Sequence, residues 1–339
     1  MEKLSQNIGF DTAKYLKYQL SAIKKTLGKF HDKLYIEFGG KLLQDKHSAR
    51  ILPGYHEDAK LELLKSFHKK GESIFVVSSR DIIRGRIRGD FDTRYDDETL
   101  RSIKELKERG LTIRHVAISL LEPGKPISHS IKSFEKKLRK KGIETHRFFE
   151  IKSYKAQASL MGELETNPFI EIKKNVVFIL SPGGGSGKFG ICLNQLYHEM
   201  KRGISPRYLK FETFPVHNLP IDHPVNLAYM AASADFYDLV MKDKRHGHAT
   251  SYKRDLENYE LLHMLARHFD TYGRYLRELT SATHMGINMI SKGIVNDEII
   301  QKEAAAEIAR RLIRYKFEVQ EGKESKKTLM RVRNILKLL

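Results

Sequence analysis

The chain has 339 residues, of which 40% are hydrophobic and 30% charged, proportions typical of a globular protein with a sizeable core. No apolar run approaches the roughly 18–20 residues that a membrane span requires, and the N-terminal segment MEKLSQNIGF has no apolar signal sequence. The single cysteine, Cys192, excludes an internal disulfide and a cysteine-based zinc site, so we expect a cytoplasmic protein.

The charge balance is strongly basic, with 61 lysines and arginines against 42 acidic residues and a net charge of +19. Such a balance favours polyanionic partners: nucleic acid, acidic lipid or phosphorylated small molecules. The charge is scattered along the chain, so a lysine-rich surface without a dedicated partner is the competing interpretation. Nothing in the sequence indicates the oligomeric state, and we expect no membrane association.

In chain order, helices and strands alternate through the first half of the sequence. The pattern predicts helices over residues 11–30, 57–71, 96–109 and 127–142, the first capped by Asp11. It predicts strands over residues 33–38, 73–79, 111–120 and 143–149. The least periodic segment, 153–172, is taken as a boundary between domains at 1–155 and 156–339.

The second half continues the alternation and then becomes helical. A strand at 175–180, a helix at 186–202 and a strand at 207–212 are followed by helices at 224–240, 252–270 and 298–317, with no strand expected after about residue 224. The spacing indicates parallel βαβ units. We therefore predict an α/β fold, doubly wound, with mostly parallel sheets, a phosphate-loop-like strand–loop–helix unit and a helical C-terminal part.

The segment NVVFILSPGGGSGKFG, residues 175–190, carries the strongest functional signal. Its apolar run is continuous, as in a central parallel strand covered on both faces. Four glycines let the backbone curl with its N–H groups pointing inward, and the following helix directs its positive end to the same place. The residues predicted to bind phosphate are Gly183, Gly184, Gly185, Ser186, Gly187 and the charged Lys188. A sharp packing turn over Gly183–Lys188 is the alternative.

The segment departs from the phosphate-loop pattern G-x-x-x-x-G-K-[ST] at two positions. Pro182 stands where the first glycine is expected, and Phe189 stands where a hydroxyl would bind magnesium. Ser186 supplies a hydroxyl from a different place. The sequence therefore predicts an anion-binding loop without the usual metal arrangement.

Several words of the sequence resemble a known bacterial family. They are KLYIEFGGKL at 33–42, SARILPGY at 48–55, RGD at 88–90, GGSGK at 184–188, CLNQLYHEMKRGI at 192–204, KFETFPVHNLPIDHPVNLAYMAASAD at 210–235 and MGINM at 285–289. The chain resembles the domain-of-unknown-function 1846 family over nearly its whole length. The resemblance implies an α/β fold with a phosphate-loop-like segment and says little about the reaction. It also implies longer members, with a C-terminal region that we expect this chain to lack.

Other residues are candidates because parallel sheets bind ligands at the carboxyl ends of their strands. Glu212 ends the predicted strand 207–212, and we assign it to holding Mg²⁺, with Thr213 beside it as a ligand contact. His223 and Asn226, in the proline-rich loop that also contains His217, are predicted to bind ligand. Glu37, at the end of the first strand, is interpreted as part of a turn rather than of a site.

Two hypotheses of different classes follow. In the first, the protein is an enzyme that binds ATP or another nucleotide, or another phosphorylated molecule, with Mg²⁺, and Lys188 and Glu212 are catalytic in phosphoryl cleavage or transfer. In the second, a non-catalytic protein binds a phosphorylated ligand at the loop or nucleic acid on its basic surface. Phe189 in place of a hydroxyl favours the second hypothesis.

Overall fold

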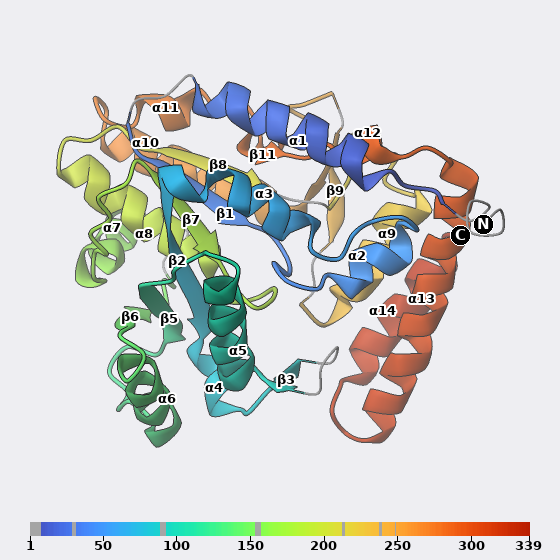
Figure 1. Ribbon diagram of the computed structural model, residues 1–339, viewed down its shortest axis with the longest axis horizontal. Helices are drawn as coiled ribbons and strands as arrows, with labels where there is room; N and C mark the ends of the chain where they lie inside the picture. The colour runs from blue at the N-terminus through green and yellow to red at the C-terminus, as the bar shows by residue number, and fades with distance from the viewer. Residues whose placement is uncertain are drawn as a thin grey trace.

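The architecture is a single seven-stranded sheet in which every neighbouring pair of strands is parallel, with helices on both faces (Figure 1). The computed structural model describes residues 8–28, 32–88, 93–152, 157–211, 214–236, 239–247 and 249–339. The strand order is β11-β8-β1-β7-β2-β5-β6. The strands are β1 (Leu34–Phe38), β2 (Gly71–Ser78), β5 (His115–Leu121), β6 (Glu144–Phe149), β7 (Val176–Leu180), β8 (Arg207–Phe211) and β11 (Gly286–Ile287).

The middle strand comes from the second half of the chain. β7 lies between β1 and β2, and Phe178 is paired with Ile36 on one side and with Ser73 on the other. Strands from both sides of the predicted boundary at 155/156 therefore share one sheet. The division into domains 1–155 and 156–339 stays a prediction, and each of these two segments contributes strands to the same sheet.

Two hydrophobic cores flank the sheet because successive side chains of each strand point to opposite faces. Ile36 and Phe178 belong to one core, and Tyr35 and Ile179 belong to the other. The first core is covered by α1 (Thr12–Leu27), α2 (Lys46–Ile51), α3 (Ala59–Phe67), α4 (Ser79–Ile83), α5 (Tyr95–Glu108), α6 (His129–Arg139), α9 (Pro224–Ala232), α12 (Ile290–Gly293), α13 (Asp297–Gln320) and α14 (Lys326–Leu336). The second is covered by α7 (Gln157–Thr166), α8 (Lys188–Lys201), α10 (Lys253–His268) and α11 (Arg274–Arg277). This arrangement confirms the predicted doubly wound α/β fold.

Helix starts follow local chemistry. Asp11 caps α1, its side chain accepting from the Lys14 N–H at 2.9 Å, as predicted. Ser128 and Asn296 cap α6 and α13 in the same way. α13 and α14 form an antiparallel pair beside α9, which gives the helical C-terminal part expected from the sequence (Figure 1).

The expectation that no strand follows residue 224 is wrong. β9 (Val240–Asp243) and β10 (Ala249–Tyr252) form an antiparallel hairpin, and β11 adds to the edge of the sheet. These strands have four, four and two residues, too short to leave a period-two pattern in the sequence. The helix predicted over 224–240 accordingly ends at Ala232.

The aperiodic segment 153–172 contains a helix that the sequence did not reveal. α7 is short and contains Gly162, and its buried residues Leu160 and Leu164 complete the second core. The remaining short elements are η1 (His68–Lys70), η2 (Ala234–Phe236), η3 (Ala282–Met285) and the β3–β4 hairpin (Ile87–Arg88, Thr93–Arg94).

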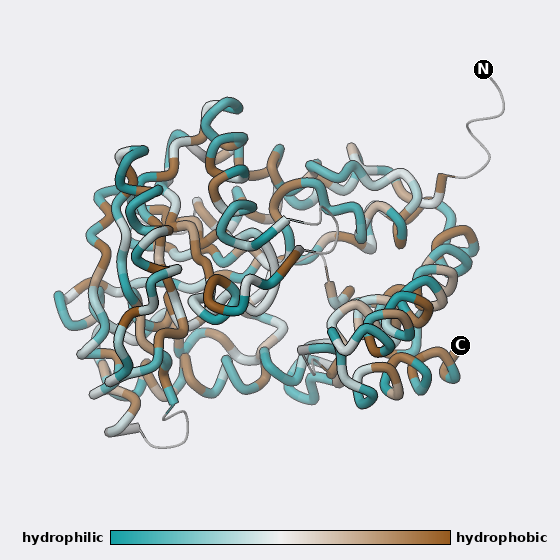
Figure 2. Tube along the Cα trace, turned by 90° about the horizontal axis from the view of Figure 1, so that it is seen from below, coloured by the Kyte–Doolittle hydropathy of each residue, from teal (hydrophilic) through white to brown (hydrophobic). Residues whose placement is uncertain are grey.

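The long helices near the C-terminus alternate between polar and apolar residues, as helices with one buried face do (Figure 2). Among the described residues, no helix has the length and apolar character needed to cross a bilayer.

Candidate functional site

The glycine-rich loop leaves the carboxyl end of β7, the central strand, and leads directly into α8. Gly185 and Gly187 have φ angles of +71° and +81°, which only glycine adopts without strain. In an open parallel sheet, ligands gather at this edge. The loop therefore lies between a central strand and the helix that follows it, as predicted from the sequence.

Two of the four glycines have a packing reason. A Cβ atom on Gly183 would lie 3.0 Å from the hydroxyl of Tyr95, and one on Gly187 would lie 3.0 Å from Oγ of Ser119. Ser119, at the end of β5, also donates to the carbonyl of Ser186 at 2.5 Å. Close approach of the loop to α5 and β5 thus accounts for part of the glycine content.

The other two glycines form the turn at the middle of the loop. Gly184 is half-buried there and Gly185 is exposed, so this turn is the part of the loop nearest to solvent. Because neither residue has a side chain, a ligand could approach their main chain closely. Ligand binding by Gly184 and Gly185 stays a prediction, and it depends on their backbone amides alone.

Lys188 is the first residue of α8, and its side chain is buried, with 5% of the residue exposed. Its ammonium Nζ donates to Oγ of Ser181 at 2.9 Å and to the carbonyl of Gly183 at 3.4 Å. Ser181 in turn donates to the same carbonyl at 2.7 Å. The Lys188 ammonium group therefore links the end of the loop to Ser181 and Gly183 at its beginning.

Ser186 lies inside the loop with an unusual hydroxyl. Only 3% of the residue is exposed, and Oγ has no hydrogen-bond partner among the described residues. A buried hydroxyl without a partner costs about 1–3 kcal/mol, so such groups are rare in folded proteins. Gly187, the N-cap of α8, offers no side chain to cap the helix. The start of α8 therefore combines an unsatisfied hydroxyl with an uncapped helix end.

The departure from the phosphate-loop pattern at residue 189 has a structural reason. The ring of Phe189 lies edge-on to Tyr208 of β8, with 5.7 Å between ring centroids. Phe189 therefore joins α8 to the sheet, and it supplies no oxygen to a metal ion.

Carboxylate and ammonium groups of neighbouring strands lie on the same face as α8. Glu37 of β1 is in register with Ile179 of β7 and Lys210 of β8, and it accepts a 2.7 Å hydrogen bond from the Tyr208 hydroxyl. Burial and the charge of Glu37 raise the pKa of Tyr208 well above its ordinary value. Glu37, interpreted from the sequence as part of a turn, is thus a buried carboxylate at the carboxyl end of β1, one of the two strands beside β7.

Lys210 forms a buried ion pair at the same edge. Its Nζ lies 2.6 and 2.8 Å from the two carboxylate oxygens of Asp255 in α10. Burial pushes the pKa of Asp255 upward, but Lys210 outweighs burial and the pKa lies below its ordinary value. His217 lies beside this pair, where burial lowers its pKa to about 4, so it is neutral near pH 7.

We call these groups the carboxyl-end cluster: Glu37, Ser181, Ser186, Lys188, Lys210, His217 and Asp255. A small cavity of about 10 Å³ adjoins Lys210, His217 and Asp255, room for about one water. Burial raises the pKa of the Cys192 thiol, which packs in the second core.

The other predicted site residues lie apart from the loop or outside the described structure. Glu212 and Thr213 lie outside the described residues; β8, which ends at Phe211, is separated from β7 by β1. His223 caps α9 by accepting from the Val225 N–H at 3.2 Å, and its Nε2 lies 3.3 Å from Asp297.

Asn226 is fully buried beneath the proline-rich loop. It accepts from the N–H of Val216 at 2.9 Å and donates to the carbonyl of Pro220 at 2.9 Å. These bonds hold the loop against α9, so the structure gives Asn226 a scaffolding position.

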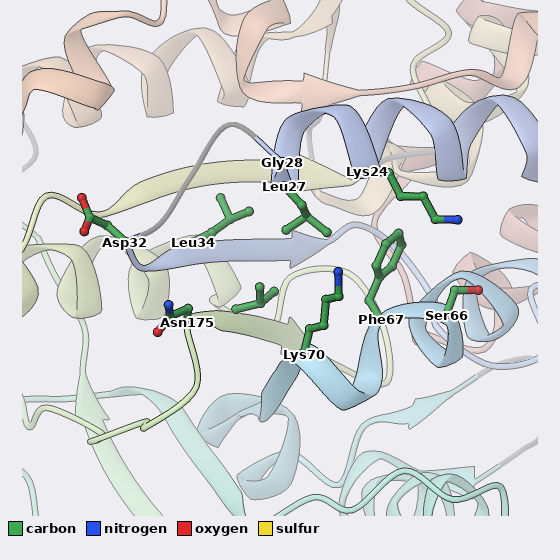
Figure 3. A pocket seen from close by; sticks show the side chains of 10 residues that line it. Lys24, Leu27, Gly28, Asp32, Leu34, Ser66, Phe67, Lys70 and Asn175 are labelled. Carbon is green, nitrogen blue, oxygen red and sulfur yellow. The ribbon is translucent and has the colours of Figure 1, made fainter.

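A larger cavity, about 630 Å³, lies away from the glycine loop, by the amino ends of β1 and β7. Figure 3 shows Lys70 extending toward α1, with Lys24 and Asp32 at the rim. This cavity leaves no sequence pattern because its lining comes from four separate segments: Lys24, Leu27, Gly28, Asp32, Leu34, Ser66, Phe67, Lys70, Asn175 and Val176.

The fold and loop define a doubly wound α/β protein with a glycine-rich loop at the carboxyl end of its central strand. A family model described as "Domain of unknown function DUF1846, N-terminal" matches residues 8–339, and the chain belongs to this family. The resemblance seen in the sequence is thereby confirmed.

Relatives from several bacteria are similar in sequence to this chain. The chain is 40% identical to a UPF0371 protein of Clostridium tetani over 344 residues, covering 97% of this chain and 66% of the relative. It is 38% identical to one of Clostridioides difficile, covering 98% and 66%, and 36% identical to one of Corynebacterium urealyticum, covering 95% and 64%. The chain thus spans about two thirds of the length of these relatives.

Proposed function

We propose that this chain binds a phosphorylated small molecule at Gly183–Lys188. The supporting observation is the hydroxyl of Ser186, which is buried inside the loop with no hydrogen-bond partner among the described residues. A phosphate oxygen at this position would accept from that hydroxyl and offset the cost of burying it. Gly185, the preceding residue, is exposed, which gives a ligand access from solvent.

The charge at the loop suits an anion. α8 presents the positive end of a 14-residue helix, and Lys188 adds a full charge at its first position. Ser181 and Gly183 give Lys188 neutral acceptors. An arriving phosphate would offer it a charged acceptor, and charge-assisted hydrogen bonds are roughly twice as strong as neutral ones.

The proposed chemistry is that of a phosphate-handling enzyme of the NTPase or phosphotransferase type, with ATP or another nucleotide as ligand. Lys188 and the loop amides, including those of Gly184 and Gly185, would neutralise charge in the transition state. Glu212 would hold Mg²⁺, with Thr213 nearby. We add Glu37 of β1 to Glu212 as a candidate carboxylate for Mg²⁺, because it lies on a strand beside β7.

A second candidate function is binding without turnover. Phe189 occupies the position of the metal-binding hydroxyl and packs on Tyr208, which favours a loop that holds phosphate without a loop-bound metal. Nucleic-acid binding through the net charge of +19 is a variant of this candidate and would weaken steeply with salt.

The test is a ligand titration of the full chain, using inorganic phosphate, ATP and a sugar phosphate, each with and without Mg²⁺. Binding is measured by calorimetry and by thermal shift for the wild type, Ser186→Ala and Lys188→Ala. The matched control is Lys201→Ala, at the other end of α8, about 20 Å away at 1.5 Å per residue. Phosphate release by the wild type separates turnover from binding.

We expect one or more of these ligands to bind the wild type and Lys201→Ala alike, and to bind both loop variants at least tenfold more weakly. A ligand that binds Ser186→Ala and Lys188→Ala as tightly as the wild type would refute the proposal. Failure of all three ligands to bind the wild type would leave the glycine loop as a packing turn.

A further inference from the structure

Three side chains of types that bind metal ions converge at the amino ends of β5 and β6. His115 and Glu144 are the first residues of these strands and are cross-strand partners, and His146 follows two residues later. Strand alternation places all three on one face, since Ala117 and Phe148, two residues further along, belong to the second core. Among the described residues this is the single group of three or more such side chains that could hold a metal ion.

The three ligand atoms are spaced as metal ligands are. Nδ1 of His115 lies 3.2 Å from Nε2 of His146 and 3.5 Å from Oε2 of Glu144, and the remaining pair is 3.9 Å apart. In tetrahedral zinc sites the metal–ligand distance is about 2.0–2.1 Å, which puts ligand atoms roughly 3.3–3.4 Å from one another. An ion therefore fits among the three atoms with shifts of a few tenths of an ångström.

A fourth residue, Glu72, lies close behind the first ligand. Oε1 of Glu72, on β2, lies 3.6 Å from Nε2 of His115, the ring nitrogen that faces away from the cluster. Metal-bound histidines usually direct their second nitrogen to a carboxylate or carbonyl, which fixes the tautomer that ligates. Arg114 lies 3.5 Å from the same carboxylate oxygen. A shift of about half an ångström would bring Glu72 into hydrogen-bond range of the Nε2–H of His115, which would favour the tautomer in which Nδ1 offers its lone pair to the cluster.

From this geometry we infer that His115, Glu144 and His146 bind a divalent transition-metal ion, with Zn²⁺ the best match to two imidazoles and one carboxylate. In the free protein the two histidine nitrogens share one hydrogen bond, and the metal would replace its proton. The side chain of Glu144 is 71% exposed, whereas those of His115 and His146 are 11% and 20% exposed. Water can therefore complete the coordination from the Glu144 side.

The position of the cluster separates it from the glycine loop. The site lies at the amino ends of its strands, whereas the glycine loop lies at a carboxyl end. It is therefore independent of the proposed phosphate site, and the failure of either leaves the other standing.

The test is a zinc titration of the full chain, purified without a polyhistidine tag and first treated with a chelator. Calorimetry is applied to the wild type, His115→Gln, His146→Gln, Glu144→Gln and Glu72→Gln, with circular dichroism to verify folding. The matched control is His284→Gln, because the His246 and His284 rings are also in contact, with centroids 4.5 Å apart. X-ray absorption of the zinc-loaded wild type identifies the ligands.

We expect one zinc ion per chain, bound normally by His284→Gln, and loss of this binding in each histidine variant. Glu72→Gln should weaken binding about 10–100-fold, as loss of a ligand-orienting partner does. The absorption spectrum should show two imidazoles and no sulfur, since Cys192 is buried. Equal binding by wild type and both histidine variants, no stoichiometric binding by the wild type, or a sulfur ligand would overturn the inference.

Discussion

Polar groups are held differently at the carboxyl ends and at the amino ends of the strands, which we call the carboxyl edge and the amino edge of the sheet. At the carboxyl edge, Lys188 and Lys210 are each about 95% buried, and hydrogen bonds to Ser181 and Asp255 hold their ammonium groups. At the amino edge, the histidine–glutamate cluster is partly open to water, and its atoms face a common centre. A buried charge without a partner strongly destabilises the folded state, whereas partly exposed metal ligands stay solvated until an ion binds. Changes at the carboxyl edge should therefore cost stability, and changes at the amino edge should mainly cost metal binding.

The largest effect is expected at the Lys210–Asp255 pair. Asp255→Ala leaves Lys210 buried without its two carboxylate bonds, so the free energy of unfolding should fall by about 3–5 kcal/mol. Chemical denaturation measures it. Glu260→Ala, on the same helix, breaks the exposed pair with Arg245 and should cost no more than about 1 kcal/mol. Equal losses in the two variants would contradict the distinction between buried and exposed pairs.

Acid should act on a second buried group beyond the carboxyl end of β1, His47 of α2. Burial and the charge of Arg311 lower its pKa to about 4, against the opposing effects of Glu307 and Asp45. The unfolded chain binds this proton near pH 6.5, so between pH 6.5 and 4 it binds more protons than the folded chain. The unfolding free energy should therefore fall by about 3 kcal/mol as the pH drops through this window.

The measurement is denaturant unfolding at several pH values in wild type and His47→Gln, in which this contribution should disappear. Exposed His56 provides the control, since His56→Gln should keep the wild-type slope. An unchanged slope in His47→Gln would show that His47 does not titrate as its burial implies.

Zinc should stabilise the protein through the amino edge alone. At a free zinc concentration 100 times the dissociation constant, binding to the folded state adds about 2.7 kcal/mol to the unfolding free energy. The gain should be absent in His146→Gln and intact in Asp255→Asn, whose substitution lies at the other edge. Thermal unfolding with and without zinc decides between these outcomes, and a gain retained by His146→Gln would place the ion elsewhere.

The smallest effect separates the two loop serines. Ser181→Ala removes a hydroxyl that bonds both Lys188 and Gly183, and should cost about 1–3 kcal/mol. Ser186→Ala removes a buried hydroxyl with no partner among the described residues, and with it the cost of burying that group, so the unfolding free energy should not fall and should rise by up to about 1–3 kcal/mol. A large loss in Ser186→Ala would mean that the hydroxyl serves the fold rather than a ligand.

The glycine loop could be predicted because its information is contiguous. An apolar run, four glycines and a lysine within residues 176–188 indicate strand, turn and helix start, and the structure has all three. The burial of Lys188 and the packing of Phe189 on Tyr208 could not be predicted, since they depend on side chains from other strands. The same holds for Glu37, whose partner Tyr208 lies 171 residues away in the chain.

The metal cluster shows this limit most clearly. His115, Glu144 and His146 have no recognisable ligand spacing in the sequence, because the first two are 29 positions apart with a whole helix between them. Parallel pairing of β5 with β6 sets them opposite each other, and β2 adds Glu72. Only the register of three strands creates the site.

Preferences that act within a few residues are sufficient for the alternation of strands and helices, the glycine loop and helix caps such as Asp11, so these features can be predicted from local sequence. The insertion of β7 between β1 and β2 and the gathering of polar groups at both ends of the strands arise from long-range packing instead. Strand order depends on the apolar surface that the whole chain buries at once, and no local stretch of sequence carries that sum.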